Sequence, residues 1–416
     1  MNPYLIDPGM LVEEELLKPE ELTSYQNRVS SSASGVLHPS DTGIDYALLF
    51  VENARMLESA WERFATGGGR QKLVAQADFE HFCADHAAWL DDYALFAAIK
   101  ETMGHRPWSE WPEDLRLRKP ESLARIAERE GGRMGRIKFA QYLVWTQWQK
   151  LRQHARERGV SILGDIPIFA AYDSADVWAH PDLFQLDAEG RPRQVAGVPP
   201  DYFTATGQLW GNPLYDWKAH ERSGFSWWIA RVSHVLNLVD ALRIDHFRGF
   251  EAYWAVPAGE PTAVHGRWEK GPGHALFNAL EQALGKLPII AEDLGFITPE
   301  VIELRDSLGF PGMRILQFAF EPDGDNQDYP HHYPEHCIAY TGTHDNDTAM
   351  GWFSSARPEA RRRALSYLHA RARSFSWDMI RGIWASPAML AVAPMQDVLG
   401  LGSEARMNYP GTMGRW

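Results

Sequence analysis

Short runs of apolar residues recur along the chain from residue 160 onward, and polar or charged residues stand at or near the C-terminal end of each run. The runs are continuous rather than alternating, which is typical of strands that are buried on both faces. They span residues 160–165, 239–245, 287–292, 313–319, 337–345 and 390–397. Stretches with helical periodicity separate them, at residues 222–238, 273–286, 298–309 and 357–371.

Strands that alternate with helices predict a parallel sheet. The chemically interesting residue stands at the C-terminal end of each run, and a (β/α)8 barrel builds its active site at that face. An open doubly wound sheet would place a ligand there as well. However, no run is followed by a Gly-x-Gly-x-x-Gly turn or a phosphate-binding loop. The pattern therefore predicts an α/β fold of the TIM-barrel type.

The pattern is different in the first part of the chain. From residue 45 it is mainly helical, and Gly159 ends the last of these helices. Residues 28–44 are rich in Ser, Gly, Pro and Asp, which is typical of a loop. We expect residues 1–158 to form a mostly helical insertion region. Residues 159–416 should then carry the barrel strands and helices with the catalytic residues.

Composition narrows the class of protein. The 416 residues include 45% hydrophobic ones, enough for a barrel with a full core. With 41 basic and 55 acidic residues the net charge is −14, which disfavours nucleic acid as a partner. No basic run suits an anionic membrane, and no stretch reaches the roughly 18 apolar residues of a membrane-spanning helix.

The N-terminal sequence MNPYLIDPG has neither a basic nor an apolar targeting region. The two cysteines, Cys83 and Cys337, lie far apart in the sequence, and we expect both to be reduced thiols. A cytoplasmic protein is the simplest interpretation.

Five of the six runs end in a carboxylate, and three of these are candidates for catalysis: Asp245 after Ala-Leu-Arg-Ile, Glu292 after Pro-Ile-Ile-Ala, and Asp345 after Tyr-Thr-Gly-Thr-His. Cleaving a glycosidic bond requires two carboxyl groups. In retaining enzymes they lie about 5–5.5 Å apart, and one attacks the anomeric carbon while the other protonates the departing oxygen. Neighbouring barrel strands end at one face, so Asp245 and Glu292 are candidates for this pair.

Arg243 stands two residues before Asp245, so the two side chains face the same side of a strand. An adjacent arginine lowers the pKa of an aspartate, and we expect this effect to keep Asp245 ionised as a nucleophile. Glu292 has no arginine at the matching position. We expect the neighbouring carboxylates to raise its pKa, as suits a general acid.

Other interpretations of these residues exist. A carboxylate at a strand end often caps a helix or forms a structural ion pair. Three of them accompanied by Arg243 and His344 favour catalysis over that interpretation. His344, Asp345 and the pair His331 and His332 could in principle bind a metal. Because no His-x-x-x-His or Cys-x-x-Cys spacing occurs, we expect neither a metal nor another cofactor.

Tryptophan is unusually frequent, with 17 residues. Five of them lie in loop-like sequence, at Trp178, Trp210, Trp217, Trp254 and Trp268. A flat aromatic face suits a sugar ring, although tryptophan also fills large cores. Core packing is the expectation for any one of the five, and sugar binding is favoured for the set taken together.

Seven segments carry a specific family resemblance. They are Gly164–Phe169, Ala196–Phe203, Gly207–Pro213, Arg243–Gly249, Ala291–Gly295, Thr341–Thr348 and Gly400–Asn408. These segments closely resemble the amylomaltases, which are 4-α-glucanotransferases of the α-amylase superfamily (glycoside hydrolase family 77). The resemblance runs from about residue 135 to residue 411. Resemblance to plain α-amylases is confined to the catalytic strand ends.

The resemblance implies a (β/α)8 barrel with helical insertions and a retaining double displacement on α-1,4-glucans. It implies that Asp245 is the nucleophile, Glu292 the acid/base and Asp345 the transition-state stabiliser. Three further positions match residues that contact the sugar: Arg243, His344 and Asp165.

The same resemblance implies a lid over the site. Tyr202 and Phe203 match the mobile loop of the family, and Trp210 matches an aromatic residue of that region. Phe318 matches an aromatic residue nearer the barrel, for which core packing is an equally good interpretation. A hydrophobic lid lets a sugar hydroxyl displace water as the acceptor, which turns hydrolysis into transfer.

The chain departs from the family at its ends. Members usually begin with two barrel strands before the sequence that matches Asn2-Pro3-Tyr4-Leu5, and they continue past Pro410-Gly411 into a closing helix. Residues 28–44 also match poorly. We therefore expect a chain shortened at both ends, with six visible strands and without the first two of the barrel. Unpaired strand edges would cost stability.

The sequence thus favours a glucanotransferase that moves α-1,4-glucan segments to glucose or to another glucan, with maltooligosaccharides or other α-1,4-glucans as partners. A catalytically impaired glucan-binding fragment and an α-glucan hydrolase are the alternatives. The sequence does not indicate an oligomeric state.

Overall fold

The computed structural model describes residues 1–31, 45–67, 75–200, 204–321 and 326–410. All described regular elements before residue 158 are helices, and the first strand begins at Leu163. The longer ones are α1 (Pro8–Glu13), α2 (Pro19–Ser31), α3 (Tyr46–Ala65), α4 (Gln76–Asp85), α5 (Ala87–Thr102), α6 (Glu113–Arg116), α7 (Pro120–Arg129) and α8 (Gly131–Glu157). The division of the chain at residue 158 into two regions stays a prediction.

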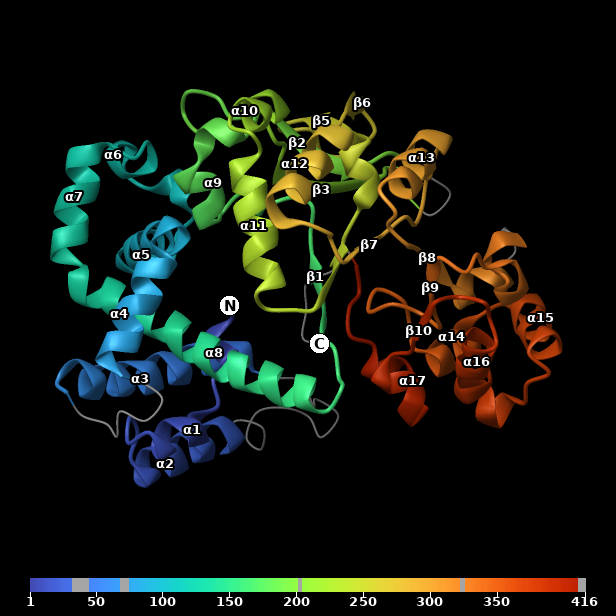
Figure 1. The fold of residues 1–416 in the computed structure, drawn as a ribbon, viewed down its shortest axis with the longest axis horizontal. Coiled ribbons are helices and arrows are strands. Elements are labelled where there is room, and N and C mark those ends of the chain that lie inside the picture. The colour runs from blue at the N-terminus through green and yellow to red at the C-terminus, as the bar shows by residue number, and fades with distance from the viewer. Residues whose placement is uncertain (32–44, 68–74, 201–203, 322–325, 411–416) are drawn as a thin grey trace.

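Helix α8 connects the helical half of the molecule to the first strand (Figure 1). Its middle turns are buried, and Phe139 stacks on Phe64 of α3 with ring centroids 4.5 Å apart. Gly159 follows the helix with φ +69°, a left-handed conformation that glycine adopts without strain. The predicted end of the helix is therefore confirmed. The predicted loop at residues 28–44 is wrong at its start, because α2 runs to Ser31, and the remainder lies outside the described residues.

Six parallel strands form the barrel part of the fold. They are β1 (Leu163–Ile166), β4 (Ala241–Ile244), β7 (Ile289–Ala291), β8 (Gly312–Ile315), β9 (Cys337–Tyr340) and β10 (Leu390–Val392). The order is β1-β4-β7 in one sheet and β8-β9-β10 in the next. The Ala291 amide donates to the Pro311 carbonyl at 3.0 Å, which joins β7 to the segment that enters β8. The six predicted strands are therefore confirmed.

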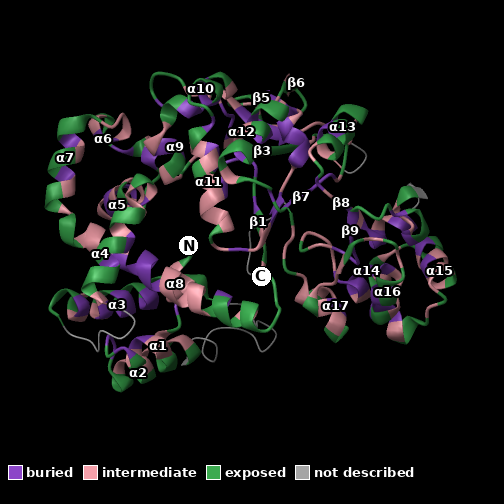
Figure 2. Cartoon of the chain, in the orientation of Figure 1, coloured by how far each residue is buried: buried purple, intermediate pink, exposed green. Residues whose placement is uncertain are grey.

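The middle strands of this arc are the best packed. Strands β7 and β9 are buried throughout, as is most of β4 (Figure 2). Within the described ranges β1 and β10 each pair with one parallel strand only. Leu163 of β1 is 38% exposed and Leu390 of β10 is 45% exposed. The three candidate catalytic carboxylates all follow the buried middle strands.

A second, antiparallel sheet was not predicted. It contains β3 (Gln208–Pro213), β2 (Gln194–Val198), β5 (Ala252–Pro257) and β6 (Arg267–Lys270), in that order. The sheet lies close to α12 and α13 in Figure 1. Its strands are inserted after the C-terminal ends of β1 and β4, so the sheet borders the face of the barrel at which the site is expected.

The four helices predicted between the strands are present as α11 (Ser226–Leu236), α12 (His274–Leu284), α13 (Pro299–Ser307) and α15 (Pro358–Tyr367). The remaining α-helices of the described chain are α9 (Ala175–Ala179), α10 (Trp217–Arg222), α14 (Ala349–Ser355), α16 (Phe375–Trp384) and α17 (Met395–Leu399).

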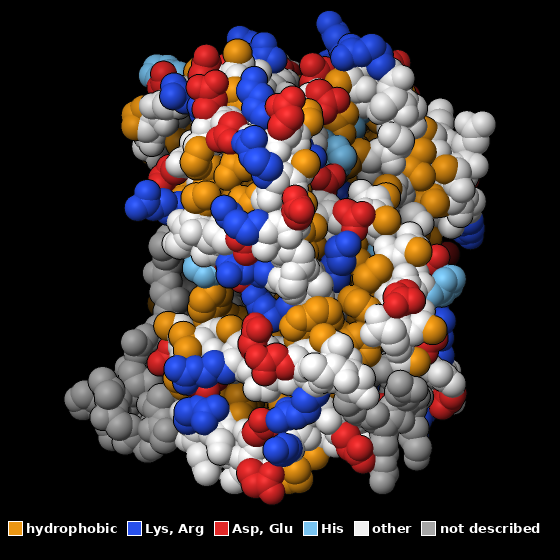
Figure 3. Space-filling view, turned by 90° about the vertical axis from the view of Figure 1, so that its left-hand side faces the viewer, with side chains coloured by type: hydrophobic (Ala, Val, Ile, Leu, Met, Phe, Trp, Pro, Cys, Tyr) orange, Lys and Arg blue, Asp and Glu red, His pale blue; other side chains and the backbone are white. Residues whose placement is uncertain are grey.

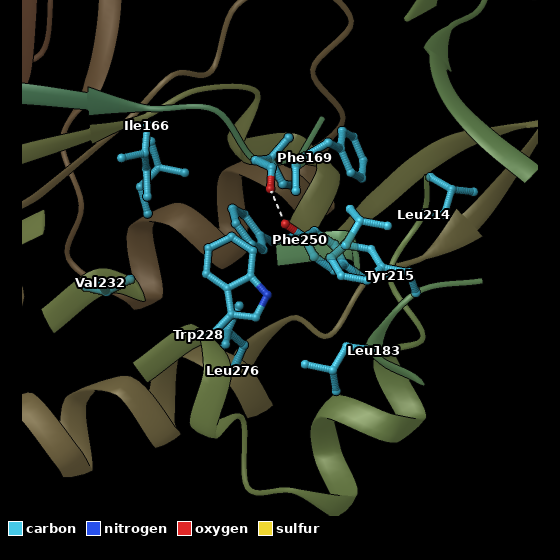
Figure 4. Packing of buried hydrophobic residues seen from close by; sticks show 14 of the residues in the cluster. Ile166, Phe169, Leu183, Leu214, Tyr215, Trp228, Val232, Phe250 and Leu276 are labelled. Atoms are coloured by element: carbon cyan, nitrogen blue, oxygen red, sulfur yellow. Dashed lines mark hydrogen bonds between the residues drawn. The ribbon is translucent and has the colours of Figure 1, made fainter. Parts of the chain in front are cut away.

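The largest core cluster lies between the strands and α11 and α12. Trp228 and Phe250 are fully buried and pack edge to face with centroids 5.4 Å apart. The hydroxyl of Tyr215 donates to the carbonyl of Ile168 at 2.8 Å (Figure 4). Phe250 belongs to a short 3-10 helix, η5 (Phe247–Phe250), which begins two residues after Asp245. The core therefore anchors the loop that carries this candidate nucleophile.

The face formed by the helical half carries acidic and basic side chains in close mixture (Figure 3). Many of them are paired, as in Arg136–Glu58 and Arg118–Asp92. None of the described helices combines the length and apolar character needed to cross a membrane. Cys83 and Cys337 are both free thiols, as predicted.

Candidate active site

Strand β4 directs Arg243 and Asp245 toward the same side, while the alternate residues Leu242 and Ile244 are fully buried. In the β1–β4 ladder Arg243 lies opposite Asp165. One terminal nitrogen of Arg243 is 2.5 Å from Oδ2 of Asp165, and the other is 3.1 Å from Oδ1 of Asp245. A single guanidinium thus connects two carboxylates on neighbouring strands.

Arg243 is only 7% exposed, and its Nε lies 3.4 Å from the sulfur of Met313 on β8. Burial by itself would lower the pKa of the guanidinium, but Asp165 and Asp245 outweigh burial and raise it. Arg243 is therefore a fixed positive charge at the floor of the site.

Glu292 follows β7 and is 9% exposed. Its Oε2 accepts the amide of His246 at 2.8 Å, and its Oε1 accepts the amide of Leu294 at 3.0 Å. Burial raises the pKa of Glu292 to about 7, and the nearby charge of Asp245 adds to the rise, against the opposing effects of Arg243 and the two amides. The predicted direction is confirmed, although burial rather than the neighbouring carboxylates is the largest cause. A pKa of about 7 gives Glu292 a proton to donate near neutral pH.

Asp245 behaves differently from the sequence-based expectation. Burial raises its pKa, Arg243 opposes this rise, and the charges of Asp165 and Asp345 add to it, so the net direction is upward. The prediction of a lowered pKa is therefore wrong. Arg243 does stabilise the carboxylate, but removal from water and two like charges exceed its effect.

Asp345 comes from the loop after β9, and three neighbours position it. Nδ2 of Asn408 donates to its Oδ1 at 2.6 Å, and a terminal nitrogen of Arg406 donates to its backbone carbonyl at 2.6 Å. Nε2 of His344 lies 3.6 Å from its Oδ2. Neither Asn408 nor Arg406 was predicted as a site residue, although both lie in a segment that resembles the family.

His246 was also missed, although it directly follows Asp245 and lies in the segment Arg243–Gly249 that resembles the family. Its backbone is left-handed, with φ 51°, an uncommon conformation for a residue with a side chain. This conformation directs its amide at Glu292. Its ring lies edge-on to the ring of Trp210, with centroids 4.8 Å apart. Burial lowers the pKa of the imidazole to about 3, so the ring is neutral at pH 7.

A cavity of about 340 Å³ opens beside this group of residues. It lies at the ends of β9 and β10, and residues from several segments line it, among them Arg243, Tyr340, His344, Gln396, Arg406 and Met407. Arg243 therefore reaches both the carboxylates and a space that can receive a ligand.

The other residues predicted from the sequence to contact the sugar differ in their surroundings. Trp210 is 37% exposed beside His246. Phe318 is half-buried and packs on the cluster that contains Met313 and Tyr340, so its contact with sugar stays a prediction. Tyr202 and Phe203 lie outside the described residues.

The five tryptophans differ in exposure. Trp178 is 1% exposed and belongs to the main core, so the sugar-binding interpretation is wrong for it, whereas Trp217 is partly buried against that core and its contact with sugar stays a prediction. Trp210 and Trp268 are more than a third exposed, and Trp254 is half-buried.

The described ranges hold no group of three or more His, Cys, Asp or Glu side chains arranged to bind a metal ion.

Known proteins have a similar fold and related sequences. A family model described as 4-alpha-glucanotransferase, glycoside hydrolase family 77, matches residues 1–416. The 4-alpha-glucanotransferases of Thermus thermophilus and Aquifex aeolicus are each 46% identical to this chain, and each alignment covers 100% of this chain and 81% of the relative. The structure of amylomaltase from Streptococcus agalactiae in complex with acarbose superposes with a TM-score of 0.92 at 36% identity. That match covers 100% of this chain and 82% of that one.

These similarities span the strands that carry the three carboxylates and the helical half alike. The six parallel strands are thus part of a (β/α)8 barrel, and the chain belongs to glycoside hydrolase family 77, the family of the 4-α-glucanotransferases.

Proposed function

We propose that this chain transfers α-1,4-glucan segments to glucose or another glucan by a retaining double displacement on Asp245 and Glu292. The observation that carries the proposal is that two carboxyl groups at neighbouring strand ends have different environments. Asp245 is ion-paired with Arg243, whereas Glu292 is buried with a pKa of about 7. Two carboxyl groups with different environments can divide the roles of nucleophile and acid.

In the first half of the reaction, an oxygen of Asp245 attacks the anomeric carbon of the donor. Glu292 gives its proton to the glycosidic oxygen as the bond to that oxygen breaks, and the leaving glucan departs with a new hydroxyl. The product is a glycosyl ester on Asp245. Arg243, which loses one ionic partner at this stage, is still paired with Asp165.

In the second half, Glu292 is a carboxylate and accepts the proton of an acceptor hydroxyl. The acceptor oxygen attacks the anomeric carbon, and Asp245 leaves as a carboxylate. Two inversions restore the original α configuration. Asp345 is proposed to stabilise the positive charge that develops on the sugar in both steps, and Asp165, Arg243 and His344 to hold the sugar.

Preference for a sugar acceptor over water requires a site that excludes water. Trp210 and the neutral ring of His246 supply an apolar flank beside Glu292. Tyr202 and Phe203 are proposed to complete this flank as a lid. Maltooligosaccharides and longer α-1,4-glucans are the proposed substrates, in line with the acarbose complex of the Streptococcus agalactiae relative.

Incubation with maltotriose separates the three candidate functions. We expect longer maltooligosaccharides together with glucose, resolved by chromatography over time. Glucose and maltose without longer products would instead indicate an α-glucan hydrolase. An absence of any turnover, with maltotriose binding retained, would indicate a catalytically impaired glucan-binding protein.

Replacing Asn408 with alanine tests how Asp345 is positioned. The hydrogen bond from Asn408 to an ionised carboxylate contributes about 1.5–3 kcal/mol. We therefore expect kcat to fall about 10- to 100-fold in Asn408→Ala, with KM and the melting temperature nearly unchanged. A parallel fall in melting temperature and in the activities toward all substrates would assign Asn408 a purely structural role.

A further inference from the structure

We propose that Trp254, Trp268 and Phe296 form a second glucan-binding surface outside the catalytic cleft, an aromatic platform that holds a glucan chain extending beyond the cleaved bond. The proposal rests on the proposed function, because it takes the substrate to be an α-1,4-glucan long enough to reach past the cleft. Three contacts build the platform.

The first contact is a cross-strand pair. Trp254 of β5 and Trp268 of β6 are directly opposite in the antiparallel ladder, so their side chains share one face of the sheet. Their ring centroids are 5.2 Å apart. The indole nitrogen of Trp254 donates to the Ala263 carbonyl at 2.8 Å, and Gly266 leaves the space that this indole fills, because a Cβ there would lie 2.2 Å from the indole nitrogen.

The second contact extends the row to the loop after β7. The rings of Trp268 and Phe296 are nearly parallel, with an interplanar angle of 21° and centroids 6.3 Å apart. Phe296 is 65% exposed and Trp268 is 38% exposed. Two near-parallel exposed rings present a broad apolar surface, which is the shape that stacks on the flat faces of glucosyl units.

The third contact is made by Arg248, which holds the rings of Trp268 and Phe296 in place. The guanidinium carbon of Arg248 lies 3.9 Å from the Trp268 ring centroid and 5.7 Å from that of Phe296. Arg248 is itself 5% exposed and donates to the Phe296 carbonyl at 2.6 Å. The buried cation therefore lies against Trp268, which is still 38% exposed.

The platform is connected to the catalytic residues through two short segments. Phe296 follows Glu292 by four residues, so their Cα atoms are at most about 14 Å apart. Arg248 stands two residues after His246, whose amide holds Glu292. A glucan that leaves the cleft on the side of Glu292 therefore meets the aromatic platform within the length of an oligosaccharide.

Polar groups for sugar hydroxyls lie beside the rings. Lys270 is two residues after Trp268 on β6, so it projects from the same face, and it is ion-paired with Glu251. The Lys270 side chain is 78% exposed, so its remaining N–H groups can donate to sugar hydroxyls. An apolar peptide over the rings would instead remove this ion pair from water without replacing its hydrogen bonds. The occupant that fits is therefore a polysaccharide chain.

Affinity electrophoresis in gels that contain amylopectin tests the platform, in an Asp245→Asn background that prevents turnover. We expect Trp268→Ala and Phe296→Ala each to weaken binding to amylopectin about five- to tenfold. Trp384→Ala is the matched control, because Trp384 is 61% exposed on α16, outside the platform. In the active chain, the same two substitutions should raise KM for amylose by the same factor and leave kcat and the turnover of maltotriose unchanged.

Unaltered amylopectin binding in both platform variants would overturn the proposal. An equal loss of maltotriose turnover would also overturn it, because the rings would then belong to the cleft. Phe296 is mostly exposed, so Phe296→Ala decides the question if Trp268→Ala folds poorly. Binding to amylopectin is measured without catalysis, so failure of the platform is distinguishable from failure of the catalytic assignment, which the turnover of Asp245→Asn reports.

Discussion

Asp245→Asn is expected to lower kcat for glucan transfer by at least about 10⁴-fold, as removal of a covalent nucleophile does in other enzymes. The substitution keeps the shape of the side chain and its contact with Arg243, whose second partner Asp165 is unchanged. Only the nucleophilic carboxylate is lost. The rate should be measured with maltotriose by product chromatography, and substrate binding should persist.

The matched control lies at the other end of the same strand. Asp240 immediately precedes β4, accepts the Ile162 amide at 2.9 Å and is paired with Arg152 and Arg156. The Ile162 amide, followed by the two arginines, lowers its pKa to about 2 against the effect of burial. Because the folded pKa lies below the unfolded value, Asp240 stabilises the fold above about pH 4, and this stabilisation is lost as the pH falls toward 2.

Asp240→Asn should therefore lower the melting temperature at pH 7 and leave kcat nearly unchanged, since the bottom face of a barrel serves stability.

If Asp245→Asn retained more than about one percent of the activity of the unaltered chain, Asp245 would not be the nucleophile.

The second large effect is expected at Glu292 and concerns the pH dependence of the reaction. With a pKa of about 7, its carboxyl is protonated below that pH and ionised above it. The first step needs the proton, so kcat/KM should decline as the pH rises above about 7. Glu292→Gln should lower kcat/KM about 10²- to 10⁴-fold and remove this alkaline decline.

An activated donor provides the control. A maltosyl fluoride has a leaving group that departs without protonation, so Glu292→Gln should form the glycosyl-enzyme from it far faster than from maltotriose. Asp245→Asn should not benefit from the same donor. An alkaline decline that persists in Glu292→Gln at the same pH would assign the acid to another group.

The three candidate carboxylates could be picked out from the sequence because each one follows a buried strand. A continuous apolar run is a local property, and parallel strands place their C-terminal residues at one face whatever the loops do. The same reasoning did not find β2, β3, β5 and β6. Strands β3 and β6 contain polar residues, and even the apolar strand β5 lies within a long connection rather than in the alternation of strands and helices. Only the mutual pairing of the four strands makes them a sheet.

The tryptophans show a second reason why the sequence alone did not predict the whole site. Trp178 and Trp268 both lie near polar and charged residues in the sequence, yet one is 1% exposed and the other 38% exposed. Which face of an indole reaches solvent depends on what packs against it. For Trp268 that neighbour is Arg248 from a distant segment.

By itself, the sequence determined the six parallel strands, the helices between them, and the positions of Asp245, Glu292 and Asp345 at the strand ends. It also determined the family, because the segments around these residues resemble amylomaltases so closely. These properties depend on residue type and on spacing along the chain.

Only the tertiary structure decided how the carboxylates differ and what holds them. Burial and like charges raise the pKa of Asp245 although Arg243 adjoins it. A left-handed His246 holds Glu292, and Asn408 reaches Asp345 from 63 positions away. Burial, charge and hydrogen bonding act through space, so they depend on which distant segments the fold brings together.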